Sequence, residues 1–221
     1  MAAGAKVIIF GIEDFAELAH YYLEKDSPHT VSAFTVDRAY IREPTFKGLP
    51  VVAFEDVETQ FPPRAYKMFA PLSPSKMGAI RAQKYLAGKE KGYEFISYVS
   101  SKATVWDAAK IGENCFILED NTIQPFVQIG NNVVLWSGNH IGHHSSIGDH
   151  CTLTSHVVVS GHVRIQPYSF FGVNSTLRDG IEIGTATFVA AGALITKNTA
   201  ANSFYKAQPA MLQDISSDKI K

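Results

Sequence analysis

The chain has 221 residues, 46% of them hydrophobic, and a formal net charge of −1. This near neutrality gives no reason to expect a nucleic-acid or membrane-surface partner. No apolar run reaches the roughly 18 residues that a membrane span needs. The N-terminus, MAAGAKVIIFG, lacks the basic and long apolar regions of a secretion signal, so a cytoplasmic protein is expected.

The first part of the chain alternates predicted strands with predicted helices. Apolar runs predict strands, and amphipathic runs predict helices, the last with Ser75 as a candidate cap. The strands are expected at 6–10, 31–36, 49–54 and 66–71, and the helices at 13–25, 55–61 and 73–91. This alternation predicts a small, Rossmann-like α/β domain with a parallel sheet over residues 1–100.

Ligands of such sheets bind near the first strand-to-helix turn, which here reads Gly11-Ile12-Glu13-Asp14. The turn keeps one glycine of a GxGxxG fingerprint, and its two carboxylates would repel a pyrophosphate, which argues against a dinucleotide cofactor. Asp37 ends the second expected strand, where a carboxylate can accept from a ribose hydroxyl or a base N–H. A solvated turn aspartate is the equally weighted alternative.

The second part of the chain has an aliphatic or aromatic residue at every sixth position. A period of six suits no helix, but it suits short strands with two inward side chains separated by bends. Such strands stack in parallel as a hexapeptide β-helix, whereas a β-sandwich would need a variable period. The repeated positions are Val105, Ile111, Ile117, Ile123, Ile129, Leu135, Ile141, Ile147, Leu153, Val159, Ile165, Phe171, Leu177, Ile183, Val189 and Ile195.

The repeats define the remaining boundaries: a β-helix domain over 101–198 and a C-terminal tail over 199–221 that covers its open end. The two cysteines, Cys115 and Cys151, fall on the inward column two residues before a repeated position. They are therefore expected to be core residues and neither a disulfide nor a nucleophile.

Six of the eight histidines lie between 140 and 162, and none occupies an inward column. They should point outward or lie at bends. Because three hexads make one coil of 18 residues, His162 should stack on His144 and Gly161 on His143. Three interpretations stay open: one histidine acts as a general base, several bind zinc, or the bends tolerate histidine for structural reasons.

An α/β domain followed by hexapeptide repeats that contain NHIGHHSSIG at 139–148 resembles the bacterial nucleotide-sugar N-acetyltransferases of the PglD/NeuD type. The resemblance covers nearly the whole chain and implies a left-handed parallel β-helix and a homotrimer. It implies acetyl transfer from acetyl-CoA, without a metal, to the amino group of a nucleotide-linked 4-amino-4,6-dideoxy sugar. Such enzymes serve the synthesis of O-antigen, other surface polysaccharides or glycan precursors.

The resemblance also implies site residues. His143 aligns with the catalytic histidine, and His144 replaces a residue that is often acidic, with Asp149 as a candidate substitute. Acetyl-CoA is expected between neighbouring β-helices. The implied substrate-binding positions are Gly11, Ile12, Glu13, Asp14, Asp37, Arg38 and Asn139, and those for acetyl-CoA are Thr152, Gly172, Val173, Ala191 and Gly192.

The expected reaction is direct attack of the amine on the thioester, with His143 as base and a backbone N–H of Gly161 or Gly172 as oxyanion donor. Three alternatives remain: a sugar O-acetyltransferase of the sialic acid type, a zinc protein like the γ-type carbonic anhydrases, or a non-catalytic subunit. The zinc enzyme is disfavoured because no two histidines stand in its His-x-x-x-x-His spacing.

Overall fold

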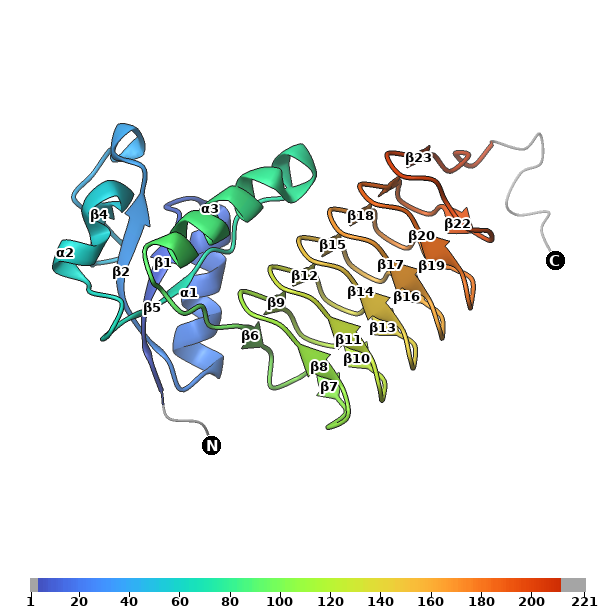
Figure 1. Ribbon diagram of the computed structural model, residues 1–221, viewed down its shortest axis with the longest axis horizontal. Coiled ribbons are helices and arrows are strands. Elements are labelled where there is room, and N and C mark those ends of the chain that lie inside the picture. The colour runs from blue at the N-terminus through green and yellow to red at the C-terminus, as the bar shows by residue number, and fades with distance from the viewer. Residues whose placement is uncertain (1–3, 212–221) are drawn as a thin grey trace, which may run out of the picture.

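The computed structural model describes residues 4–211. Their first part is an α/β domain around a five-stranded sheet with the order β3-β4-β2-β1-β5 (Figure 1). All its strands pair in parallel except β3, which runs antiparallel to β4. The strands are β1 (Lys6–Phe10), β2 (Thr30–Val36), β3 (Thr45–Phe46), β4 (Leu49–Ala53) and β5 (Lys67–Phe69). The four predicted strands are confirmed to within two residues, and the short β3 was missed.

Helices cover both faces of this sheet, as a buried parallel sheet requires. Alternate residues of β1 serve the two faces: Val7 and Ile9 pack with α1, and Ile8 and Phe10 pack with α2 and α3. The α-helices are α1 (Asp14–Asp26), α2 (Val57–Gln60) and α3 (Ala79–Glu90), and the 3₁₀ turns are η1 (Arg38–Tyr40), η2 (Phe54–Asp56) and η3 (Ser75–Gly78).

The predicted start of the last helix, with Ser75 as its cap, is wrong. Lys76, Met77 and Gly78 have φ values of 52°, 56° and 77°, so the chain makes a left-handed turn before α3 begins at Ala79. Gly78 is required there, because a Cβ would lie 2.9 Å from the backbone oxygen of His150. That constraint comes from the second domain, so local periodicity could not reveal it.

The described residues that follow wind into a triangular prism whose three faces are each a parallel sheet (Figure 1). This prism is the left-handed β-helix expected from the repeats and from the resemblance. The seven-stranded face holds β6 (Tyr98–Val99), β9 (Phe116–Ile117), β12 (Val134–Leu135), β15 (Thr152–Leu153), β18 (Phe170–Phe171), β21 (Phe188–Val189) and β23 (Phe204–Tyr205).

The six-stranded face follows it in each coil and holds β7 (Thr104–Val105), β10 (Thr122–Ile123), β13 (His140–Ile141), β16 (Val158–Val159), β19 (Thr176–Leu177) and β22 (Leu194–Ile195). The five-stranded face completes the coil and holds β8 (Lys110–Ile111), β11 (Gln128–Ile129), β14 (Ser146–Ile147), β17 (Arg164–Ile165) and β20 (Glu182–Ile183).

The six-residue column fills the prism. From Ile117 to Ile195 every member is buried, and the first two, Val105 and Ile111, pack against the same cluster. Residues 18 apart pair directly, for example Ile123 with Ile141. At the far end β23 adds a strand beside β21, and Tyr205 and Ala207 pack on the core. The predicted tail cover is thus described only to residue 211, and residues 212–221 lie outside the described part.

The α/β domain docks on the first coils through an apolar contact and a polar one. Phe116 and Val134, on the outside of the seven-stranded face, share a core with α1 and the sheet. Arg81 of α3, only 1% exposed, reaches the edge between the five- and seven-stranded faces. Burial lowers its pKa to about 10. Its acceptors are the backbone oxygens of Leu72, Asn132, His150 and Cys151 and the side chains of Asn132 and Thr152.

Within residues 4–211 no helix is long and apolar enough to cross a membrane.

Candidate functional site

Turn chemistry explains four of the six clustered histidines. His144, His150, His156 and His162 each have φ between 58° and 65°, at the left-handed position of a prism edge. Histidine is among the residues that tolerate this conformation, and asparagine takes the same position at Asn114, Asn132 and Asn174. The structural interpretation therefore accounts for their spacing of six. It does not explain His143, which comes one residue before the left-handed position.

His143, His144 and His162 form a cluster on the edge between the six- and five-stranded faces. The Nδ1 atoms of His143 and His144 are 3.1 Å apart. The ring of His162 stacks on that of His144, with centroids 5.0 Å apart and an interplanar angle of 16°, and Phe126 lies on the other side of His144. The predicted stacking of His162 on His144 is confirmed, and all three histidines are exposed.

Two features of neighbouring coils fix the position of His143. Its backbone N–H donates to Oε1 of Gln124 over 2.8 Å. Its ring lies over Gly161, where a Cβ would be 2.9 Å from Cε1 and 3.0 Å from Nε2. Gly161 thus provides the space for the imidazole. Within the described residues no acceptor is found for the Gly161 N–H, so a hydrogen-bond donor remains free beside the ring.

The contact with His144 defines the tautomer in which His143 can act as a base. If Nε2 is to accept a proton, Nδ1 carries the hydrogen and donates it to Nδ1 of His144. His144 therefore takes the orienting place that a carboxylate would take. Asp149, the other candidate, lies on a different edge, where its Oδ1 accepts from the N–H of Asn131 over 2.7 Å.

The six histidines were predicted to point outward or to lie at bends, and His150 takes the second arrangement. It lies at a bend and is only 7% exposed, because α3 covers it. Its Nδ1 lies 2.9 Å from Nδ2 of Asn132, and burial lowers its pKa. Its role is to pack the domain junction.

A cavity of about 900 Å³ lies in the α/β domain between the β1–α1 turn and the start of α3. It is lined by the predicted residues Gly11, Ile12, Glu13, Asp14 and Asp37. The positive φ of Gly11, 124°, and the 3.2 Å that would separate a Cβ from Ala16 explain the single glycine. Lining residues that the sequence reading missed are Tyr40, Arg42, Leu72, Ser73, Lys76, Ile80, Gln83 and Lys84.

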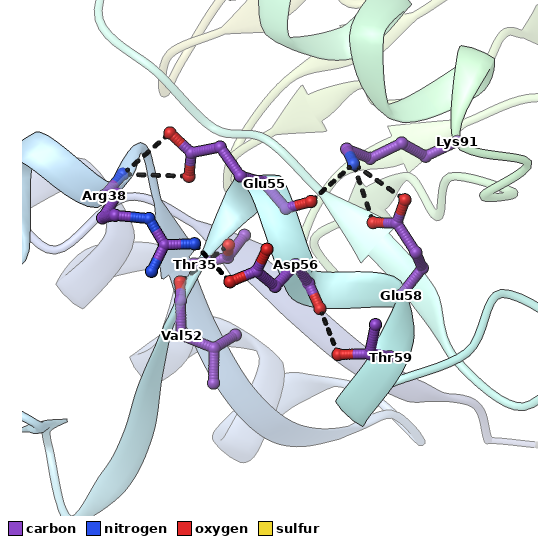
Figure 2. Close-up of polar contacts among 8 residues, drawn as sticks. All are labelled: Thr35, Arg38, Val52, Glu55, Asp56, Glu58, Thr59 and Lys91. Atoms are coloured by element: carbon purple, nitrogen blue, oxygen red, sulfur yellow. Dashed lines mark hydrogen bonds and ion pairs between the residues drawn. The ribbon is translucent and has the colours of Figure 1, made fainter.

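Asp37 lies in this cavity opposite a lysine of α3. Nζ of Lys84 is 2.6 and 2.7 Å from its two carboxylate oxygens, and both side chains are largely covered. Its neighbour Arg38 is not among the residues that line the cavity, and its predicted contact with the substrate stays a prediction. Figure 2 shows the Arg38 guanidinium paired with Asp56 and its backbone N–H aimed at Glu55, on the outside of the domain.

Two further predicted positions have side chains that are enclosed within the chain, and their ligand contacts stay predictions. Asn139 is 1% exposed inside the prism, where Oδ1 accepts from the N–H of Val157 over 2.8 Å and Nδ2 donates to the oxygen of Trp136. Thr152 is 2% exposed beneath α3, and its hydroxyl accepts from Arg81 over 3.0 Å. An inward column and a docked domain therefore remove both from solvent.

The other predicted acetyl-CoA positions form one strip. Gly172 and Val173 turn the edge between the seven- and six-stranded faces, and Ala191 and Gly192 turn it one coil later. The Gly192 N–H donates to the Val173 oxygen over 2.8 Å. Val173, Ala191 and Gly192 are exposed. The Gly172 N–H donates to Val189 over 2.7 Å, so it is not available as an oxyanion donor.

One chain does not bring these parts together. The α/β domain docks on the seven-stranded face, and the edge that carries His143 is the one opposite that face. The strip of Gly172, Val173, Ala191 and Gly192 lies on a different edge, between the seven- and six-stranded faces.

The two cysteines lie outside these three places. Cys115 and Cys151 are buried as predicted, and burial raises the pKa of their thiols to about 11 and about 12.

Two known family models match the repeat region of this chain. The family described as bacterial transferase hexapeptide (six repeats) matches residues 108–142 and 127–161. The family described as hexapeptide repeat of succinyl-transferase matches residues 168–197. No curated protein matches this sequence.

Several solved structures share the fold. PerB from Caulobacter crescentus, in complex with CoA and GDP-perosamine, is 20% identical, with a TM-score of 0.79 over 90% of this chain and 93% of that one. The acetyltransferase domain of PglB from Neisseria gonorrhoeae is 17% identical, with a TM-score of 0.76 over 88% and 93%. WeeI from Acinetobacter baumannii is 17% identical, with a TM-score of 0.59 over 90% and 95%.

These comparisons agree with the resemblance that the sequence suggested. The repeats match the family models of bacterial transferase hexapeptides, and the α/β domain joined to the prism reproduces the architecture of PerB and of the PglB domain over nearly the whole chain. The chain is thus a left-handed β-helix protein with hexapeptide repeats, and it shares its fold with PerB and with the acetyltransferase domain of PglB.

Proposed function

We propose that this chain is an acetyl-CoA-dependent N-acetyltransferase that acts on a nucleotide-linked 4-amino-4,6-dideoxy sugar, in the synthesis of O-antigen, another surface polysaccharide or a glycan precursor. The observation that carries the proposal is the setting of His143. Turn chemistry does not explain its imidazole, which lies over a glycine with a free N–H, and its Nδ1 is held by His144.

The cavity of the α/β domain is the proposed site of the nucleotide sugar. Its size, about 900 Å³, is within the range of ligand pockets. Its charges are mixed: Lys76, Lys84 and Arg42 supply cations for a diphosphate, and Asp37 supplies acceptors for ribose or base. The structure of PerB, which holds GDP-perosamine, supports a nucleotide-linked amino sugar as substrate.

Acetyl-CoA is proposed to lie along the strip of Val173, Ala191 and Gly192, whose small side chains leave the backbone accessible. Structures of PerB with CoA and of the PglB domain with acetyl-CoA support this co-substrate. Since the strip, the cavity and His143 lie on different sides of one chain, we propose a homotrimer in which each active site takes parts from neighbouring copies.

The chemistry needs a neutral amine, a base and an oxyanion donor. The amine nitrogen attacks the thioester carbonyl, and Nε2 of His143 accepts the proton that the amine loses. The Gly161 N–H, beside the imidazole, can donate to the oxyanion of the tetrahedral intermediate. When the intermediate collapses, the C–S bond breaks, the amide forms, and His143 returns its proton to the departing thiolate. No acetyl-cysteine forms, because both thiols are buried.

The test is an assay of free thiol release from acetyl-CoA with GDP-, UDP- and dTDP-linked 4-amino-4,6-dideoxy sugars. His143→Ala should lower turnover about 10²–10⁴-fold, the usual contribution of a general base, and leave the melting temperature nearly unchanged. The matched control is His156→Ala, an exposed histidine on another edge, which should keep full turnover. Full turnover in His143→Ala would overturn the base assignment.

The same assay separates the remaining candidates. An O-acetyltransferase would acetylate a hydroxylated sugar and leave the amino sugar untouched, which mass spectrometry of the product detects. A non-catalytic subunit would give no heat on calorimetric titration with acetyl-CoA. Either result would replace the proposed N-acetyl transfer.

A further inference from the structure

We infer that His143, His144 and His162 form a binding site for a divalent transition-metal ion such as Zn²⁺, and that the ion switches off the proposed base. One nitrogen from each ring can be chosen so that all three lie within 4.8 Å of one another. Among the residues that the structure describes, this is the only such group of three histidine, cysteine or acidic side chains.

The spacing of the ring nitrogens suits a tetrahedral ion. Zn²⁺ binds imidazole nitrogen at about 2.0–2.1 Å, so two nitrogens on one tetrahedral ion are separated by about 3.3–3.4 Å. The Nδ1 atoms of His143 and His144 are already 3.1 Å apart. One ring nitrogen of His162 lies within 4.8 Å of a nitrogen of each of the other two rings, and because all three rings are exposed, water can take the fourth position.

The backbone holds the three histidines in place before any ion arrives. His144 and His162 occupy the same turn position in adjacent coils, and the His162 N–H donates to the oxygen of His143 over 3.0 Å. Phe126 packs beneath the ring of His144. An ion therefore binds rings whose positions are already restricted, which lowers the entropic cost of chelation.

Metal binding changes the tautomer of His143. Without metal, one hydrogen lies between the two Nδ1 atoms, and Nε2 of His143 is free to accept a proton. An ion bound to both Nδ1 atoms takes the place of that hydrogen, and neutral His143 then carries its proton on Nε2. In this form it cannot accept a proton from a substrate. This inhibition rests on the proposed function of His143, whereas the binding itself does not.

The test uses untagged, chelator-treated full-length protein titrated with Co²⁺, followed by the visible absorption of tetrahedral Co²⁺, and with Zn²⁺ by calorimetry. We expect one ion per chain. His162→Asn should weaken binding at least about 10–100-fold, the effect of losing even an outer partner of a metal site. Asparagine suits the left-handed backbone at this position. The matched control is His156→Asn, which alters an exposed histidine at the same turn position of another edge and should bind as the wild type does.

The acetyl-transfer assay adds a second measurement. Zn²⁺ should inhibit the wild-type protein. His162→Asn should need a Zn²⁺ concentration higher by the same factor for half inhibition, with each protein compared with its own metal-free rate. Binding that is absent, or equal in wild type and His162→Asn, would overturn the metal site. A chain that binds Co²⁺ as expected but transfers no acetyl group would overturn the proposed function and leave the metal site standing.

Discussion

Gly161 determines where the imidazole of His143 can lie. Its φ is not in the left-handed region, so the backbone would accept alanine, but the added methyl would stand 2.9–3.0 Å from the His143 ring. The glycine is therefore a matter of space at the site and not of chain conformation. A single residue without a side chain thus contributes to the geometry of the proposed base.

Replacing Gly161 with alanine should displace the ring and lower turnover about 10–100-fold, since a shift of about 1 Å costs about that much. The melting temperature should change little, because the ring is exposed and free to move aside. Ser160→Ala, one residue earlier in the same coil, is the control and should keep turnover. Unchanged turnover in Gly161→Ala would mean that the His143 ring position does not matter.

At this scale the sequence predicted the stacking of Gly161 on His143, because the period of 18 residues sets it. It could not predict that the His144 ring would contact Nδ1 of His143, as a carboxylate would, since that contact depends on the torsions of both side chains. It also could not show that Thr152 is enclosed, whereas Asn139, two residues before Ile141, stands on the inward column that the repeats define. Thr152 is covered by Arg81 of α3, a contact between residues 71 positions apart that local pattern does not encode.

Among the elements, the junction of α1 with the first coil has an acidic anchor. Asp26, the last residue of α1, accepts from the hydroxyls of Tyr98 and Ser100 and from the N–H of Ser101, at 2.7, 3.1 and 2.9 Å. Burial alone would raise the pKa of Asp26, but these hydrogen bonds outweigh it and lower the pKa from 3.8 to about 2. The fold therefore favours the ionised carboxylate.

This anchor should make stability depend on pH in a defined window. Because the pKa is lower in the folded chain, the stabilisation is present above about pH 4 and is lost as pH falls towards 2. Asp26→Asn should cost about 1–2 kcal/mol at pH 7 and flatten the fall of melting temperature between pH 4.5 and 2.5. The control is Asp107→Asn, an exposed carboxylate in the same coil. If the melting temperature of Asp26→Asn fell as steeply with pH as that of the wild type, Asp26 would not be the source of the pH dependence.

Elements were predicted better than their contacts. The strand positions followed from apolar runs of five or six residues, and the prism followed from its period. The docking through Asp26 and Arg81 could not be predicted, because most of their partners are backbone and side-chain groups of the β-helix that come within reach only once both domains have folded. The left-handed turn before α3 escaped for the same reason.

For the whole molecule, the separation of the cavity from His143 is the feature that bears on assembly. The cavity belongs to a domain that sits on the seven-stranded face, and His143 lies on the opposite edge. The prism cannot bend to bring the cavity and His143 together, because its core is filled along its whole length. A reaction that uses both therefore needs the cavity of one copy and the histidine of another.

This requirement predicts that two inactive variants restore each other. Asp37→Arg blocks the cavity and His143→Ala removes the base, so each alone should be inactive. When the two are co-expressed with different tags and purified by both tags, every mixed trimer has one site in which an intact cavity meets an intact histidine. Turnover should then reach about one third of the wild-type value, measured against a doubly tagged wild-type trimer. If cavity and histidine served one another within a single chain, the mixed trimers would stay as inactive as their parents.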